Sequence, residues 1–536
     1  MNIRRSGLGA VLFASVFTLA SSLPAQQPAP VHTDKGPVQG TVVDGITVYK
    51  GIPFAAPPLG DLRWRAPRPH AAWTDVLKAD KFAPACMQTP IVMPALGLDA
   101  VEVDEDCLYL NVWTPAKTPK DKLAVMVWIY GGGFTIGGTS LKQYDGANLA
   151  RKGVLLVSIA YRLGTLGSLA HPELSKEQGG HSGNYGMMDQ IAGLQWVKKN
   201  IAAFGGDPHR VTIFGESAGG ISVSMLSASP LAKGLFTGAI SESGGNFAPE
   251  SHGNEGGTNM ISLATAEKNG AGFLTRLGAS SIADARKKSA ADILKAQPPG
   301  LGGGSSWPIF DGYVLLGDQY KLYEAGKYND TPILVGTNAD EGALFVAATT
   351  PAAYQKQIKD GYGEYADKIF AAYPGDTDAN ALRSARDMSR DTLFAWPTWA
   401  WARLQSKTGK GKVYVYYFNH RPPYPDQPQF KDWGAAHGAE ISYVFGNFTS
   451  AMPPADADKA LSEQVSAYWT NFAKTGDPNG GGLPSWPAFT DANQQAMNLN
   501  DPSHAIPMPN VEKLKALDGY YAWRRNQAGS KAAGGK

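Results

Sequence analysis

Residues 215–219 read Gly-Glu-Ser-Ala-Gly, and a serine at the centre of this pattern is suited to nucleophilic chemistry. A strand-like segment, 210–214, precedes the motif, and a helix-like segment follows it from Ile221. A sharp turn between a strand and a helix holds such a serine in strained geometry, and the flanking glycines avoid collisions with neighbouring elements. The pattern therefore predicts Ser217 as the nucleophile of an acyl-transfer reaction.

A run of glycines follows an earlier strand-like segment. Residues 123–130 are apolar and lead into Gly131, Gly132, Gly133 and Phe134, where backbone N–H groups can face a ligand without side-chain obstruction. Such groups stabilise the oxyanion that forms when a hydroxyl attacks a carbonyl. The competing interpretation, a dinucleotide-binding loop, requires glycine at position 136, where isoleucine stands. We therefore expect an oxyanion hole here.

A serine hydroxyl needs a base, and the base needs an acid to orient it. In this type of arrangement both follow the serine along the chain, which leaves His420, His437 and His504 as candidate bases. His437 is the best placed, because its small neighbours permit a loop to bring the imidazole close to Ser217. Spacing alone leaves the acid open among three residues that lie just beyond buried strands: Asp311, Asp340 and Glu341.

Alternating strand and helix patterns must position these side chains. The runs 123–130 and 154–161 are continuously apolar and of strand length, which is typical of strands buried on both faces. Residues 185–203 have helical spacing, and the strand-like segment 210–214 follows them. This order indicates an α/β fold with a large, mostly parallel sheet flanked by helices, in one domain covering 26–536. Further segments extend the pattern: strands at 236–241 and 332–336 and a helix at 455–474.

The N-terminus has the pattern of a secretory signal peptide at residues 1–25. Arg4 and Arg5 precede an apolar stretch, 7–19, and small residues lead to a cleavage position near Ala25. The arginine pair is also compatible with twin-arginine export. The apolar stretch is short for a membrane span, and no cysteine follows it to carry a lipid, so we expect a secreted or periplasmic protein without a stable membrane anchor.

Composition restricts the partners further. With 49 Lys and Arg against 47 Asp and Glu, the formal charge is +2, which gives no reason to expect nucleic acid as a partner. In an exported chain the two cysteines, Cys86 and Cys107, predict a disulfide. We find no ligand cluster that calls for a metal, expect no cofactor, and predict no oligomeric state.

Taken together, the motifs resemble those of the type B carboxylesterase and cholinesterase family, which includes bacterial para-nitrobenzyl esterases. The resemblance spans roughly residues 36 to 525. It implies an α/β-hydrolase fold and ester hydrolysis without a cofactor. The matching blocks are 51–58, 105–112, 130–134, 184–186 with 189–190, 215–220, 338–342 and 437–440.

The resemblance also assigns roles that spacing leaves open. It implies that Glu341 orients His437, and that the N–H groups of Gly132, Gly133 and Ala218 form the oxyanion hole. It further implies the disulfide between the two cysteines. Two family ion pairs are matched and given a structural role: Glu105 with Arg63, and Arg162 with Asp189.

Substrate preference depends on fewer residues. Cholinesterases carry a tryptophan in the loop closed by the first disulfide, and this chain has none between Cys86 and Cys107, so a choline ester is a disfavoured substrate. Phe134, Trp396 and Trp399 predict an apolar, aromatic-lined pocket for neutral esters, although the two tryptophans also suit a buried core. The alternative functions are a catalytically silent binding protein, and an amidase or thioesterase using the same three side chains.

Overall fold

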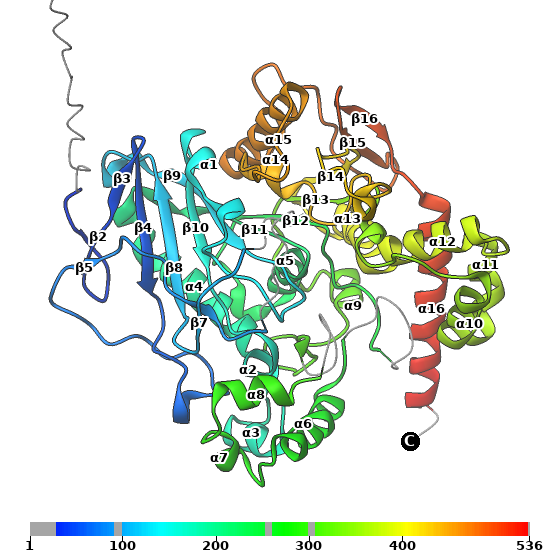
Figure 1. Ribbon diagram of the computed structural model, residues 1–536, viewed down its shortest axis with the longest axis horizontal. Coiled ribbons are helices and arrows are strands. Elements are labelled where there is room, and N and C mark those ends of the chain that lie inside the picture. The colour runs from blue at the N-terminus through cyan, green and yellow to red at the C-terminus, as the bar shows by residue number, and fades with distance from the viewer. Residues whose placement is uncertain (1–27, 90–98, 252–259, 299–305, 534–536) are drawn as a thin grey trace, which may run out of the picture.

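A large mixed β-sheet forms the centre of the protein (Figure 1). The computed structural model describes residues 28–89, 99–251, 260–298 and 306–533, so the expected signal peptide lies outside the described residues. In this part of the chain the sheet has 11 strands, in the order β16-β15-β14-β13-β12-β11-β9-β10-β8-β4-β3. Pairing is parallel from β15 to β10 and antiparallel at both edges.

The parallel strands are the apolar segments of the sequence. Their interior residues are buried because helices cover the sheet. They are β9 (Leu123–Ile129), β10 (Leu155–Ile159), β11 (Gly206–Glu216), β12 (Gly238–Glu242), β13 (Ile333–Asn338), β14 (Val413–Phe418) and β15 (Gln495–Leu499). The antiparallel edges are β3 (Thr41–Val43), β4 (Ile46–Pro53) and β8 (Tyr109–Thr114) on one side and β16 (His504–Pro507) on the other.

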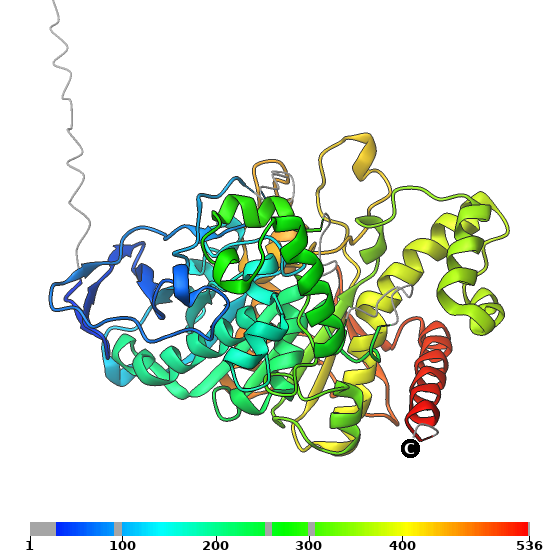
Figure 2. The same cartoon turned by 90° about the horizontal axis from the view of Figure 1, so that it is seen from below.

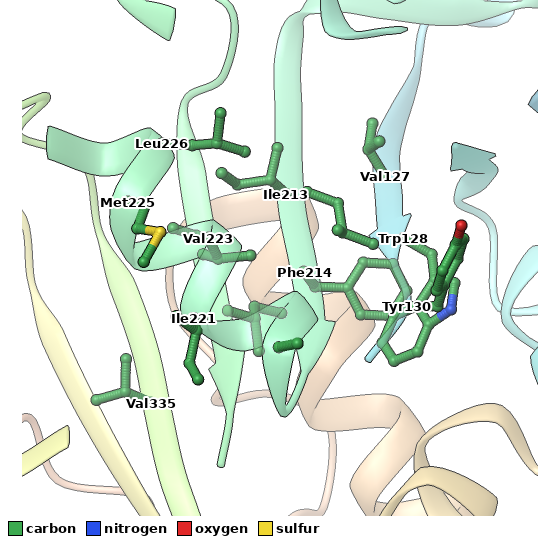
Figure 3. Close-up of a cluster of buried hydrophobic side chains, with 14 of the residues drawn as sticks. Val127, Trp128, Tyr130, Ile213, Phe214, Ile221, Val223, Met225, Leu226 and Val335 are labelled. Carbon is green, nitrogen blue, oxygen red and sulfur yellow. The ribbon is translucent and has the colours of Figure 1, made fainter. Parts of the chain in front are cut away.

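Helices pack on this sheet and connect its strands along the chain. α4 (Tyr185–Asn200) precedes β11, and α5 (Ala218–Ala228) follows it directly and packs on β11 and β12. α15 (Asp456–Thr475) contacts β9 and β11. Figure 3 shows apolar side chains of α5, β9, β11 and β13 gathered into one buried cluster around the strand that leads to Ser217.

A group of helices lies on the side of the molecule where the last strands of the chain, β14 to β16, form one end of the sheet (Figures 1 and 2). α10 (Pro351–Tyr362), α11 (Ala366–Ala372) and α12 (Asp378–Arg390) pack together, and α16 (Val511–Ala533) contacts α11. α13 (Trp396–Thr408) connects this group to the sheet by packing on β13 and β14. Of the helices described, none has both the length and the apolar character needed to cross a membrane.

The expected elements are present, with ends that differ by a few residues. The helix expected at 185–203 ends at Asn200 and continues as a 3-10 turn to Phe204, which Gly205 closes with a positive φ of 86°. The antiparallel edges were not expected, because their short strands lack the continuous apolar runs of the centre. One cluster of buried side chains extends from Val38 to Tyr521, although the division into a signal peptide and a single domain stays a prediction.

Candidate active site

Ser217 occupies the turn between β11 and α5 with φ 56° and ψ −124°, a backbone conformation that few residues other than glycine adopt. Its N–H donates to the carbonyl of Glu242 on β12 at 2.9 Å, which holds the turn against the neighbouring strand. A Cβ at Gly215 or Gly219 would lie 2.5 or 1.9 Å from the carbonyl oxygen of Ile129 on β9. The two glycines are therefore needed because β9 approaches the turn so closely.

His437 connects Ser217 to a carboxylate. Its Nε2 lies 2.8 Å from Ser217 Oγ, and its Nδ1 lies 2.6 Å from Glu341 Oε2. The loops that carry the imidazole and the acid are tied together, because Asp340 N–H donates to the Ala435 carbonyl and Ala435 N–H donates to Asp340 Oδ2, at 3.0 and 2.9 Å. The structure thus brings together three residues, of which the first and the last are 220 positions apart in the sequence.

The carboxylate of Glu341 is fully buried and held from both sides. Its Oε1 accepts the backbone N–H of Asn338 at 2.7 Å and the hydroxyl of Ser243 at 2.5 Å, which leaves Oε2 for the histidine. An ionised carboxylate only accepts hydrogen bonds, so in the neutral imidazole Nδ1 of His437 carries the proton and Nε2 is free to accept one from Ser217. The arrangement fixes the tautomer that a general base needs.

The serine and histidine open into a cavity of about 560 Å³. Gly132, Gly133 and Ala218 line the same cavity, as an oxyanion hole requires. Among the described residues that line it, Glu216 and His437 are the ionisable ones that can carry charge near neutral pH, and none is Lys or Arg. The wall is otherwise mainly apolar, with Ile136, Phe247, Trp307, Leu344, Phe345, Leu393, Phe394, Pro397, Tyr424, Ile441, Phe448 and Met452 among its residues.

Two aromatic rings cover the imidazole of His437. The ring of Phe394 lies nearly parallel to it, at 4.4 Å between centroids and 19° between planes, and the ring of Phe345 is tilted at 5.1 Å. Phe394 comes from a short π-helix, Asp391–Ala395, which leads into α13. The aromatic covering shields the histidine from water on these faces and limits its rotation.

Buried charges change the protonation of the site. Burial alone disfavours a charge on His437, but the negative charges of Glu216 and Glu341 outweigh it and raise the pKa of His437 to about 9. Burial raises the pKa of Glu216 to about 8, although an imidazolium at His437 opposes this. Glu216 Oε1 lies 3.2 Å from His437 Nε2, so each group favours the charged form of the other.

Comparison with known proteins identifies the family. The model of the Carboxylesterase family matches residues 27–516. The chain belongs to this family. It is 38% identical to the fumonisin B1 esterase of Sphingopyxis macrogoltabida over 85% of this chain and 84% of that protein, and 36% identical to the para-nitrobenzyl esterase of Bacillus subtilis (strain 168) over 91% and 98%. A solved PNB esterase structure, 35% identical, covers 91% of this chain and 99% of its own with a TM-score of 0.78.

These comparisons confirm the α/β-hydrolase fold and make the protein a carboxylic ester hydrolase. The carboxylesterase also contains the expected disulfide between Cys86 and Cys107. The two expected ion pairs are present: Arg63 with Glu105 near the disulfide, and Arg162 with Asp189 in the interior.

The residues expected to form the aromatic pocket occupy other positions. In this carboxylesterase Trp396 and Trp399 lie in the core, where their indole N–H groups donate to Asp518 and Gln494. The cavity is lined instead by Leu393, Phe394 and Pro397, because the π-helix turns this face of the chain toward the histidine. Phe134 stands behind the wall, with its ring 4.9 Å from that of Trp307, which lines the cavity.

The other candidate bases and acids have structural roles. Asp311 Oδ1 accepts three successive backbone N–H groups, those of residues 313–315, and so organises a turn. Asp340 fastens the loop that carries His437. His420 lies between Asp458 and Asn500, and His504 is exposed.

Sequence reasoning gave no role at the site to three residues that lie near it: Ser243, Asn338 and Phe394. Asn338 donates its side-chain amide to Glu440 at 2.5 Å, so a second buried carboxylate lies behind the first. Ser243 and Asn338 stand at the ends of strands β12 and β13, where active-site residues of α/β folds gather, and Asn338 also opens the family block 338–342. Phe394 belongs to the same aromatic stretch as Trp396 and Trp399, but helical spacing favoured the tryptophans because the position of Phe394 depends on a local π-helix.

Proposed function

We propose that this carboxylesterase hydrolyses neutral carboxylic esters with apolar or aromatic groups, through an acyl-enzyme on Ser217. The observation that supports this most directly is the chain of contacts from Ser217 Oγ through His437 to Glu341, at 2.8 and 2.6 Å, at the wall of an apolar cavity. A nucleophile, a base and an acid in this order perform acyl transfer on unrelated folds.

In the first step Ser217 Oγ attacks the ester carbonyl carbon while its proton passes to His437 Nε2. Glu341 stays ionised and stabilises the imidazolium. The negative charge on the former carbonyl oxygen is stabilised by the N–H groups of Gly132, Gly133 and Ala218. When this intermediate collapses, the ester C–O bond breaks and the alcohol takes the proton from Nε2.

In the second step His437 accepts a proton from water, whose oxygen attacks the acyl carbon. The resulting intermediate expels Ser217, which recovers its proton from His437, and the carboxylic acid leaves. All proton transfers use residues of the chain itself, so the proposal needs no metal or cofactor.

The preference for neutral esters follows from the wall of the cavity. No Lys or Arg among the described lining residues offers a partner to an anionic acyl group. A quaternary ammonium group lacks the tryptophan face that cholinesterases place in the disulfide loop, because the sequence has none between Cys86 and Cys107. Aromatic and aliphatic side chains favour substrates that bury apolar surface.

Two experiments test the proposal. Ser217→Ala removes one hydroxyl at the cavity wall, so we expect a folded protein whose ester turnover falls by several orders of magnitude. A fluorophosphonate should label Ser217 in the wild type. Near-normal turnover in the folded variant, or labelling of Ser243 instead, contradicts the assignment. Butyrate esters of a phenol, a simple alcohol and choline should rank with choline last in kcat/KM once leaving-group reactivity is corrected, and a preference for choline refutes the substrate class.

We also propose that the enzyme acts outside the cytoplasm, on the basis of the N-terminal pattern at residues 1–25 and the disulfide. N-terminal sequencing of the protein recovered from the periplasm or medium should begin near Gln26. An intact N-terminus on a protein that stays in the cytoplasm contradicts it.

A further inference from the structure

A single glutamine connects the disulfide loop to the glycine turn that lines the cavity. Gln88 Nε2 donates to the carbonyl of Gly137 at 2.7 Å, and Gly137 N–H donates back to Gln88 Oε1 at 2.8 Å. Nε2 also donates to the carbonyl of Cys86 at 3.0 Å. Gln88 is 5% exposed, so these contacts are sheltered from water. The side-chain amide of Gln88 thus binds both the N–H and the carbonyl of Gly137, as the backbone of a neighbouring strand would.

The glycine turn needs such a partner because it lies beyond the sheet. β9 ends at Ile129, and the chain then passes through glycines with positive φ, 100° at Gly132 and 121° at Gly137. Glycine has the largest backbone freedom to lose, so these residues are fixed only if other groups hold them. Within the turn, the N–H groups of Thr135 and Ile136 donate to the Gly132 carbonyl at 3.0 and 3.1 Å, which makes 132–136 one closed unit.

Gly137, the residue that follows this closed unit, is held on two sides. Gly137 lies so close to the ring of Tyr130 that a Cβ there would be 2.5 Å from Cδ2, and its polar groups bind Gln88. Gln88 in turn is two residues from Cys86, whose bond to Cys107 anchors it. Movement of Gly137 would therefore turn the unit that carries the N–H groups of Gly132 and Gly133.

We infer that Gln88 is a positioning residue for ester hydrolysis: by pairing with Gly137 it holds the Gly132 and Gly133 N–H groups in the direction that stabilises the oxyanion. The inference rests on the proposed function, in which those N–H groups form the oxyanion hole. Gln88 touches neither substrate nor Ser217 in this role. Its loss should weaken interactions made in the transition state and leave the binding of the ester ground state nearly unchanged.

The decisive variant is Gln88→Met, which keeps the length of the side chain and removes both hydrogen bonds to Gly137 together with the one to the Cys86 carbonyl. Gln88→Glu keeps an acceptor for Gly137 N–H but places a carboxylate against the Gly137 carbonyl, so it should be impaired as well. Gln405 offers a matched control, because it accepts from Trp401 Nε1 at 3.0 Å and donates to the Thr331 carbonyl at 2.6 Å. It is 1% exposed and is not among the residues that line the cavity.

Kinetics separate positioning from general structural support. Removing one oxyanion donor outright costs about 100- to 1000-fold, so displacing the turn in Gln88→Met should lower kcat by roughly 10- to 100-fold on a neutral butyrate ester, with KM changed by less than about threefold. Gln405→Met should lower the Tm and leave kcat within about twofold. A kcat within twofold of wild type in folded Gln88→Met, or an equal loss in Gln405→Met, overturns the inference.

A transition-state analogue provides an independent measurement. A trifluoromethyl ketone accepts Ser217 Oγ at its carbonyl carbon while the hydroxyl proton passes to His437, and the oxygen of the resulting hemiketal occupies the oxyanion hole. Its affinity should fall in Gln88→Met by the same factor as kcat/KM, and an unchanged affinity overturns the inference. Absence of Ser217-dependent turnover in the wild type would instead refute the proposed function, so the two failures are distinguishable.

Discussion

Replacing Glu341 by glutamine tests how the buried acid controls the proton on His437. Oε1 of Glu341 receives two donors, the Asn338 N–H at 2.7 Å and the Ser243 hydroxyl at 2.5 Å. In Glu341→Gln the single amide oxygen satisfies this side, so the NH2 group faces Nδ1. The imidazole must then carry its proton on Nε2, where it cannot accept the proton of Ser217.

The expected loss has two parts. The wrong tautomer and the missing negative charge remove the stabilisation of the imidazolium, which in a comparable triad lowers kcat by about four orders of magnitude, or roughly 5 kcal/mol of activation free energy. Folding should suffer less, by about 1–3 kcal/mol, because every buried polar group keeps a partner of some kind. The variant should therefore be folded and nearly inactive.

Asp311→Asn is the matched control, since Asp311 also lies buried just beyond a strand-like segment. Its Oδ1 accepts three backbone N–H groups, and asparagine retains that oxygen, so kcat/KM should stay within about tenfold of wild type. The measurement is kcat/KM on a neutral ester, with circular dichroism to verify folding. A larger loss in Asp311→Asn than in Glu341→Gln, or a loss below about tenfold in folded Glu341→Gln, refutes the reasoning.

Three further results are expected. Because the pKa of His437 is raised to about 9 and the base must be neutral, kcat/KM should increase as pH rises through that value. Glu216→Gln removes a negative charge that favours the imidazolium, so the acid limb of the pH profile should move to lower pH. An unchanged acid limb contradicts this expectation. Mass spectrometry should find the Cys86 and Cys107 peptides joined, and freely alkylated thiols in the exported protein contradict this. Replacing both cysteines by alanine should lower the free energy of unfolding by about 3 kcal/mol in urea titrations. Asp189→Ala leaves a buried guanidinium without its carboxylate and should cost about 3–5 kcal/mol by the same titration, whereas a loss below about 1 kcal/mol would show that the guanidinium finds water.

The sequence was informative where a residue's role depends on local geometry. Ser217 and the glycines beside it are recognisable because a strand, a sharp turn and a helix must follow one another in a fixed order. The parallel strands were recognisable for a similar reason, since burial on both faces demands continuous apolar runs. The choice of Glu341 over Asp311 needed the family resemblance, because all that spacing shows is that each follows a buried segment.

The pocket was harder to predict because its wall comes from side chains that meet only after folding. Trp396 and Trp399 suggested an aromatic face, but their indole N–H groups bind Asp518 and Gln494 in the core. A π-helix directs Phe394 toward the imidazole instead. A π-helix has one extra residue in its turn, and the periodicity of the sequence does not predict it. Contacts of this kind depend on the distance between elements and not on the composition of either.

The absence of Lys and Arg from the described cavity wall also bears on the end of the reaction cycle. A neutral ester enters, but the acid that is formed loses its proton at neutral pH and becomes an anion. It then lies in a cavity whose described lining includes the carboxyl group of Glu216 and no Lys or Arg, so the imidazolium of His437 is the lining cation available to hold it. Release of the product should therefore depend on the charge of His437: we expect accumulated acid to inhibit weakly above the pKa of His437, where the imidazole is neutral, and more strongly below it.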